Sequence, residues 1–396
     1  MIIDDCKALN EIKMELTGHI IPFWSALKDE ENGGFYGFMN NALELDKKAD
    51  KGVILHARIL WFYSQAYITL KDEMLKGYAF HAFEFMKNHC IDYEKGGVYW
   101  MLDHKGSPVD TMKHTYNIAF CIYALSCYYN AFGDRFALDL AYKLFTDIEE
   151  NTLDEYGYRE AFSRDWQLID NEALSENGLK ADKTMNTVLH LIEAYTELLK
   201  ADRSERVEER LRFLLSQMSD IIYDADTDAL RVFFDEKFRL VGDIHSFGHD
   251  IEATWLTDRA CKVIGDAALI EKFRQINVRI ARNIQKLAID TDGAMKNERE
   301  NDKIDATRVW WVQAEAVVGF INAYQNSNDE AFLKTAKGVW DYIRDNVVDK
   351  REGGEWFSEL EADGTPREYK EQVGPWKCPY HNGRMCLEVI ARGVEL

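Results

Sequence analysis

Three ionisable side chains, His245, His249 and Glu252, lie close together in the segment 242–255, which reads Gly-Asp-Ile-His-Ser-Phe-Gly-His-Asp-Ile-Glu-Ala-Thr-Trp. Residues three apart on a helix share a face, so the carboxylate of Glu252 could hold the tautomer of the His249 imidazole. Such an imidazole takes or gives a proton near neutral pH. The segment therefore predicts half of an acid–base site. A core histidine satisfied by a neighbouring acid is the simpler alternative.

A metal site is another interpretation of the same segment, with His245, His249 and Glu252 as ligands. The zinc pattern HEXXH is absent, and we expect the helix to begin at Gly248, which takes His245 off the shared face. The nucleotide-binding patterns GxxxxGK[ST] and GxGxxG are absent as well. We therefore expect neither a metal nor another cofactor.

Short segments rich in glycine and aromatic residues recur at near-equal steps, around positions 34, 97, 157, 229, 293 and 354. Each is typical of a brief strand or turn. Strongly apolar helices follow, beginning near positions 55, 116, 184, 249, 309 and 380, and amphipathic helices alternate with them over 12–27, 78–90, 137–151, 207–222, 270–287 and 332–347. A closed ring needs no polar capping repeat. We predict an all-α protein, an (α/α)6 barrel with short β-hairpins in the loops at one end, and one catalytic domain over 1–396.

The inner helices of such a barrel all start at the same end, so their first residues should surround one cavity. Those starts are rich in polar and aromatic side chains: His56, Arg58, Tyr116, Asn117, Asn186, His190, His249, Glu252, Trp310, Trp311, Glu315, His381, Asn382 and Arg384. Burying so many donors and acceptors costs free energy unless they are paired or functional. The pattern predicts a functional cavity.

Individual members of this set allow more than one interpretation. Two prolines near His381 fix the chain's approach to its helix, which aims the side chain or merely shapes a turn. A buried Arg58 needs an anionic partner, either structural or catalytic. His190 is as consistent with a satisfied core histidine as with a site residue. Several tryptophans at one cavity mouth suit the apolar faces of a sugar, although any one could be plain packing.

The amino-acid composition limits the classes of binding partner and the cellular location that we expect. A formal net charge of −21 argues against nucleic acids and anionic membranes, and it favours a neutral substrate. Seven cysteines without a CxxC pair indicate reduced thiols. The acidic start of the chain is unlike a signal peptide, and no apolar run approaches the ~20 residues of a membrane span. We expect a cytoplasmic protein that is a monomer or a weak homo-oligomer.

Six segments taken together resemble the cellobiose 2-epimerases of the N-acylglucosamine 2-epimerase superfamily. They are 50–58 (Asp-Lys-Gly-Val-Ile-Leu-His-Ala-Arg), 113–117 (Lys-His-Thr-Tyr-Asn), Asn186 with His190, 242–252, 308–311 (Arg-Val-Trp-Trp) and 374–384 (Gly-Pro-Trp-Lys-Cys-Pro-Tyr-His-Asn-Gly-Arg). The resemblance implies a cofactor-independent enzyme that inverts C2 of the reducing-end glucose in β-1,4-linked disaccharides. Cellobiose would become glucosyl-mannose, and lactose would become epilactose.

The resemblance also implies roles for individual residues. His249 and His381 would be the acid–base pair, with Glu252 as the partner of His249. Arg58 and His190 would stabilise the intermediate. The sugar would contact Trp310 and Trp376, and the same pocket would be lined by Tyr116, Asn186 and Trp311.

The chemistry that these residues fit is proton transfer beside a carbonyl. The pyranose opens, the C1 aldehyde acidifies the C2 proton, and one histidine removes that proton to give a cis-enediolate, which is reprotonated on the other face. A glycoside hydrolase on the same barrel is a rival interpretation, with Glu252 and Glu315 as its carboxylates. A second rival is an aldose–ketose isomerase, and a third is a carbohydrate-binding or scaffold protein without activity.

Overall fold

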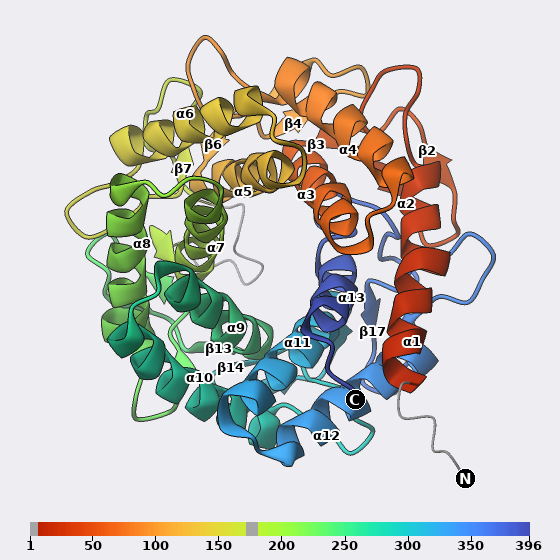
Figure 1. Cartoon of the computed structure of the whole chain (residues 1–396), viewed down its shortest axis with the longest axis vertical. Coiled ribbons are helices and arrows are strands. Elements are labelled where there is room, and N and C mark those ends of the chain that lie inside the picture. Colours follow the sequence, from red (N-terminus) through yellow and green to blue (C-terminus); the bar gives the residue numbers. More distant parts are fainter. Residues whose placement is uncertain (1–6, 172–180) are drawn as a thin grey trace.

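The computed structural model describes residues 7–171 and 181–396 and places their helices in two concentric rings (Figure 1). The inner ring consists of α3 (Val53–Leu70), α5 (Thr115–Phe132), α7 (Met185–Ala201), α9 (Phe247–Ile264), α11 (Trp310–Ser327) and α13 (His381–Arg392). The outer ring consists of α4 (Glu73–Phe85), α6 (Arg135–Asn151), α8 (Glu205–Gln217), α10 (Ala267–Leu287), α12 (Glu330–Tyr342) and the pair α1 (Lys7–Glu15) and α2 (Ile21–Ala26). Since α1 packs against α13, the first helices close the last hairpin. The predicted (α/α)6 barrel is confirmed.

The two rings differ in how their helices are buried. Inner helices are apolar on most sides, and every residue from Val53 to Ser64 of α3 is buried. Outer helices bury one stripe, and α4, α6, α10 and α12 begin with an aspartate cap. Asp134 accepts hydrogen bonds from backbone N–H groups in the first turn of α6, as Asp72, Asp266 and Asp329 do at α4, α10 and α12. Five-residue π-helical segments extend α4, α8 and α12 and join α1 to α2 (Met86–Cys90, Met218–Ile222, Ile343–Val347 and Leu16–Ile20).

The strands are short, and most of them tie neighbouring hairpins together. The strand directly before an inner helix pairs with a strand from the loop of the following unit, as Lys51 pairs with Leu102 and Arg308 with Leu360. This linkage goes beyond the local hairpins that the sequence predicts, because it fixes each inner-helix start to the next one. Over the described ranges the strands form small antiparallel sheets. Four of these sheets have two strands: β1 (Phe38–Met39) with β2 (Leu45–Asp46), β6 (Lys113–His114) with β7 (Ala161–Phe162), β9 (Tyr223–Asp224) with β10 (Ala229–Leu230), and β16 (Arg308–Val309) with β17 (Glu359–Leu360). Three have three strands: β3 (Lys51–Gly52) with β4 (Met101–Leu102) and β5 (Pro108–Asp110), β8 (Lys183–Thr184) with β11 (Phe233–Phe234) and β12 (Leu240–Val241), and β13 (Ile244–Ser246) with β14 (Glu298–Glu300) and β15 (Lys303–Asp305).

A similar ion pair recurs in the segments that connect an outer helix to the next inner helix. Lys51, two residues before α3, places its Nζ 2.7 Å from Oδ2 of Asp29, and both side chains are fully buried. Equivalent pairs precede α5, α7 and α11, namely Lys113 with Asp92, Lys183 with Asp154 and Arg308 with Asp290. These pairs hold the inner-helix starts in position. In the two fully buried pairs, Lys51 with Asp29 and Lys113 with Asp92, leaving either charge alone would cost on the order of 3–5 kcal/mol. Asp154 and Asp290 are partly exposed, so their pairs contribute less.

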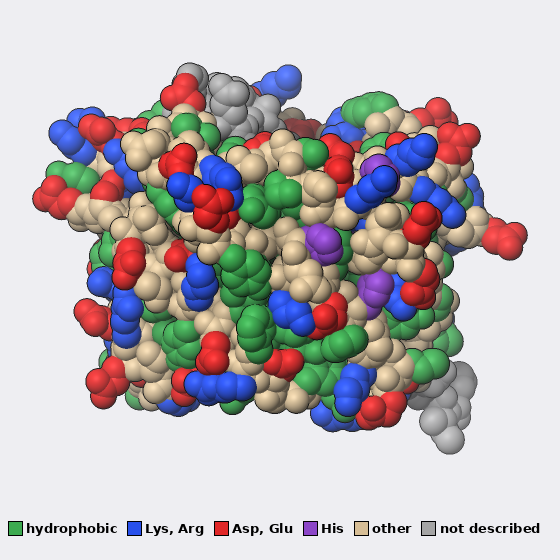
Figure 2. All heavy atoms as spheres, turned by 90° about the horizontal axis from the view of Figure 1, so that it is seen from above, with side chains coloured by type: hydrophobic (Ala, Val, Ile, Leu, Met, Phe, Trp, Pro, Cys, Tyr) green, Lys and Arg blue, Asp and Glu red, His purple; other side chains and the backbone are tan. Residues whose placement is uncertain are grey.

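The surface and the thiols agree with an ordinary globular protein. Figure 2 shows acidic and basic side chains mixed over the flank of the ring. Within the described ranges the cysteines are free and buried, while Cys6 lies outside these ranges. None of the described helices combines the length and apolarity that a membrane crossing requires.

Candidate active site

A cavity of about 420 Å³ opens at the end of the barrel where the inner helices start. Its lining includes all ten side chains to which the resemblance assigns a role, from every inner helix and the loop before α13: Arg58, Tyr116, Asn186, His190, His249, Glu252, Trp310, Trp311, Trp376 and His381. Five other helix-start residues that the sequence predicts around the cavity are buried but are not part of this lining: His56, Asn117, Glu315, Asn382 and Arg384. Residues from six distant parts of the chain meet there because the ring places the helix starts side by side.

His381 is oriented by a carboxylate from the neighbouring inner helix. Its Nδ1 lies 2.7 Å from Oε1 of Glu315 on α11. A carboxylate only accepts hydrogen bonds, so Nδ1 carries the hydrogen and Nε2 keeps its lone pair. Burial, and then the positive charge of Arg384, hold the pKa of His381 well below its ordinary value. The imidazole is therefore neutral, and the lone pair on its Nε2 can accept a proton.

His249 has a different partner from the one predicted. Its Nδ1 is joined to Oγ of Ser246 at 2.7 Å, whereas Glu252 directs its carboxylate to Arg384. The predicted pairing of Glu252 with His249 is wrong, because His249 stands in the first turn of α9 and its ring bonds back to the preceding strand. Burial is the main reason that the pKa of His249 falls to about 3.

The third imidazole, that of His190, is held by Glu193. Nδ1 of His190 lies 2.9 Å from Oε2 of Glu193, which also accepts from the hydroxyl of Tyr380 at 2.6 Å. Burial lowers the pKa of His190. Glu193 was not among the predicted site residues, although its spacing of three residues from His190 is the signal that was applied to His249 and Glu252.

Arg384 lies at the centre of these carboxylates. Its Nη1 donates to Glu193, and its Nη2 donates to Glu252 and, at 2.7 Å, to Glu315. Glu252, Glu315 and His381 have possible metal-ligand atoms within 4.8 Å of one another. The guanidinium of Arg384, however, already supplies the positive charge between the two carboxylates. The alternative metal ligands of the segment 242–255 do not converge either, since Nε2 of His245 lies 2.7 Å from Asp250.

Arg58 brings a second buried positive charge to the cavity. Its Nη2 donates to the hydroxyl of Tyr116 at 2.9 Å, and its guanidinium stacks on Phe120 and Tyr380, 4.3 and 4.9 Å from the ring centroids. Its remaining hydrogen bond within the described residues goes to Sγ of Cys378. The structural carboxylate partner that a buried arginine could have is not among these contacts, so its charge is available to a ligand.

Aromatic rings and polar groups complete the cavity walls. Trp311 contacts both imidazoles, with centroid distances of 4.8 Å to His249 and 5.4 Å to His381. Trp376 is 39% exposed and stands at the mouth. Oδ1 of Asn186 is buried and has no hydrogen-bond partner in the part of the chain that the structure describes, which leaves an acceptor for a ligand.

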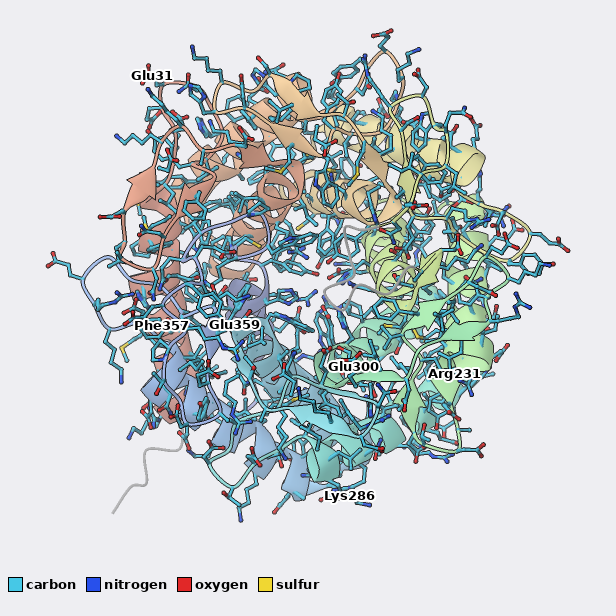
Figure 3. The ribbon with its side chains drawn as sticks, turned by 180° about the vertical axis from the view of Figure 1, so that it is seen from behind. Glu31, Arg231, Lys286, Glu300, Phe357 and Glu359 are labelled. Carbon is cyan, nitrogen blue, oxygen red and sulfur yellow. The ribbon has the colours of Figure 1, made fainter. Side chains whose placement is uncertain are left out.

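A charged rim of the cavity was not predicted from the sequence. Asp305, Glu359, Arg367 and Lys370 line the cavity from the loops, and Figure 3 shows Glu359 beside the central opening. These residues carry no helical or repeat signal of their own. They reach the cavity only through β15, β17 and the loop after β17.

This is the fold of the (α/α)6 toroid enzymes, and the cavity has the aromatic and polar lining that a sugar requires. The model of the N-acylglucosamine 2-epimerase (GlcNAc 2-epimerase) family matches residues 33–383, and the chain belongs to this family. A cellobiose 2-epimerase from Ruminococcus albus is 69% identical over 388 residues, which cover 98% of this chain and 100% of that protein.

Solved structures agree with this membership. The crystal structure of a sugar epimerase from a ruminal bacterium has a TM-score of 0.97 at 68% identity and covers 98% of this chain and 100% of its own. The cellobiose 2-epimerase from Bacillus thermoamylovorans has a TM-score of 0.94 at 46% identity, with 97% and 99% covered. The chain is thus a carbohydrate epimerase, an enzyme of the isomerase class, as the resemblance implied.

Proposed function

We propose that the protein inverts C2 of the reducing-end glucose in β-1,4-linked disaccharides, converting cellobiose to glucosyl-mannose and lactose to epilactose. Similarity over nearly the whole chain to proteins named cellobiose 2-epimerase supports the substrate class. The observation that carries the reaction type is the pair of neutral imidazoles, His249 and His381, that pack against the same indole of Trp311. The proposal includes a single cytoplasmic catalytic domain that needs no cofactor, as a monomer or weak homo-oligomer.

The proposed reaction begins with opening of the reducing-end pyranose. The C1 aldehyde then acidifies the C2 proton. One of the two histidines removes that proton as a neutral base, and the other, which must be an imidazolium at this step, protonates the opposite face. Two imidazoles suit a reversible epimerisation because each acts as base in one direction and as acid in the other. The hydrogen bonds of their Nδ1 atoms with Glu315 and Ser246 fix which ring nitrogen faces the sugar.

Arg58 has the position and charge to stabilise the enediolate. Its guanidinium is buried and has no carboxylate among its hydrogen-bond partners within the described residues, so the negative oxygen formed in the reaction would be its anionic partner. A charge that finds its partner only as the intermediate forms lowers the barrier more than it strengthens substrate binding. His190 would act beside it, and the rings of Trp310 and Trp376 would pack on the sugar.

A glycoside hydrolase fits the geometry less well. Its two carboxylates must flank the glycosidic bond at a separation of about 5–9.5 Å. Glu252 and Glu315 instead bind the same nitrogen of Arg384, and their nearest oxygens lie within 4.8 Å of each other. They stand together on one side of the guanidinium rather than on opposite sides of a substrate.

NMR of cellobiose or lactose incubated with the protein in D₂O tests the proposal. We expect an isomeric disaccharide whose C2 carries deuterium. A ketose would identify an aldose–ketose isomerase instead, because the proton would have moved to C1. Free glucose would mean hydrolysis, and an unchanged disaccharide that binds in calorimetry would mean a binding protein.

A further inference from the structure

The buried charges around Arg384 do not balance if every carboxyl group is ionised. Glu193, Glu252 and Glu315 are three buried carboxylates, and Arg384 and Arg58 supply two positive charges. The neighbouring imidazoles are neutral because burial lowers their pKa values. An uncompensated charge in such a site is expensive, and one additional proton removes it.

The hydrogen bonds indicate which carboxyl group holds that proton. Glu193 accepts from His190, Tyr380 and Arg384. Glu315 accepts from His381, Arg384 and, at 3.0 Å, Nε1 of Trp255. Among the described residues, Glu252 accepts from Arg384 alone, through Oε1, and its Oε2 is buried without a partner. Since donated hydrogen bonds stabilise the ionised form, Glu252 is the group that stays protonated.

The electrostatics of the cluster separate Glu252 from Glu193. Burial and then the charge of Glu315 raise the pKa of Glu252 to about 8. Burial also opposes ionisation of Glu193, but Arg384 and the hydrogen bond from His190 bring its pKa down to about 2. Burial raises the pKa of Glu315 as well, so the hydrogen bonds that Glu315 accepts are what distinguish it from Glu252. Glu252 lines the cavity, so its proton is within reach of a bound ligand.

We propose that Glu252 is a neutral carboxylic acid that protonates the ring oxygen of the bound reducing-end pyranose, and that the protein therefore also catalyses the interconversion of α and β anomers. This inference rests on the proposed function, since it takes the same sugar as substrate. It adds a second measurable activity, ring opening and closing without change at C2.

The step balances within the residues of the cavity. The C1–O5 bond breaks, and its electron pair goes to O5, which receives the proton of Glu252. The O1–H bond supplies the electrons of the new C1=O bond, and its proton goes to Nε2 of His190, whose Nδ1 is held by Glu193. Reversal closes the ring, and closure on the other face of the aldehyde gives the other anomer.

Freshly dissolved α-lactose provides the test, because NMR resolves its anomers and its epimer in one sample. We expect wild-type protein to speed the approach to anomeric equilibrium in proportion to its concentration. Glu252→Gln keeps the shape without the acid and should lose about 10²-fold or more of that acceleration. Glu252→Asp keeps an acid and should restore part of it. Glu388→Gln is the matched control: Glu388 pairs with Arg259 deeper in the barrel, outside the cavity lining.

The outcomes separate this inference from the proposed function. If wild-type protein forms the epimer without accelerating anomer exchange, or if Glu252→Gln exchanges anomers at the wild-type rate, the role of Glu252 is wrong while the epimerase proposal stands. If no epimer forms, the proposed function fails. An infrared spectrum adds a readout independent of turnover: the wild type at neutral pH should show the carbonyl stretch of a protonated carboxyl group that folded Glu252→Gln lacks, and its absence would overturn the inference.

Discussion

The hydrogen bond between Nδ1 of His381 and Oε1 of Glu315, 2.7 Å long, joins the last two inner helices of the ring, α13 and α11. Both residues are buried. The orientation of the His381 imidazole thus depends on α11 as well as on its own helix. One barrel contact determines which nitrogen of the ring faces the cavity.

Replacing Glu315 by glutamine should lower kcat by roughly 10²–10⁴-fold, with a smaller effect on KM. The amide can donate as well as accept, so it no longer fixes the hydrogen on Nδ1 of His381 or supports a positive imidazolium. Initial rates of epimer formation measure the loss. Trp255→Phe is the control, because it removes a donor to Oε2 of Glu315 and leaves the pair with His381 in place. A kcat within about twofold of wild type in Glu315→Gln would contradict the positioning role.

Alanine at either His249 or His381 should abolish formation of the C2 epimer, whichever epimer is supplied. A two-base epimerisation needs one imidazole on each face of C2, so loss of either one stops interconversion in both directions. NMR of the disaccharide reports epimer formation directly. Ser246→Ala tests the positioning of His249 separately and should reduce the rate without eliminating it. Near-normal epimer formation in His249→Ala or His381→Ala would refute the two-histidine mechanism.

Arg58→Ala should lower kcat far more than it raises KM. The guanidinium meets its anionic partner only when the enediolate forms, so its removal weakens the transition state more than the substrate complex. Steady-state kinetics with cellobiose separate the two constants. Tyr116→Phe removes the 2.9 Å hydrogen bond to Arg58 but keeps the charge, and we expect a smaller loss. A rise in KM alone would assign Arg58 to substrate binding.

The sequence was sufficient for the fold because the ring is built from signals that recur. Glycine-aromatic turns mark each unit, and apolar and amphipathic helices alternate between them. The start of α9 at Phe247 lies one residue from Gly248, where the sequence predicts it. The ion pairs that fix the inner-helix starts also recur, as Lys51 and Lys113 show, yet the partners of these two lysines stand more than twenty residues earlier in irregular turns.

The sequence could predict which residues line the cavity, but it could not predict the hydrogen bonds among their side chains. The inner helices of the barrel start at the same end, so the polar residues at those starts predict where the cavity lies. Which carboxylate faces which imidazole depends on contacts such as that between Arg384 and Glu252, 132 residues apart. Arg384 attracts Glu252 away from His249, and Ser246 takes its place. The spacing of residues along the sequence does not reveal such competition between side chains for one carboxylate.

His19 closes the outer ring through a contact that should make stability depend on pH. It lies in the π-helical segment between α1 and α2, with Nδ1 2.7 Å from Glu15 and Nε2 2.9 Å from the carbonyl oxygen of Gly354. Two acceptors require two N–H groups, which only the imidazolium has. The hydrogen bond to Glu15 is the largest cause that raises the pKa of His19 from 6.5 to about 9, and the charge of Glu355 adds to it.

Because the folded pKa of His19 is raised, its stabilising contribution is complete below about pH 6.5 and declines as the pH rises through about 9. We expect the Tm of the wild type to fall between about pH 6.5 and 9.5 more steeply than that of His19→Gln, whose side chain does not titrate. The variant should be less stable at the lower pH, and the two should converge at the higher one. Glu15→Gln should flatten the profile in the same way, because it removes the charge that keeps the imidazolium protonated. If the Tm of wild type and of His19→Gln changed in parallel with pH, the imidazolium of His19 would not contribute to the stability of this contact.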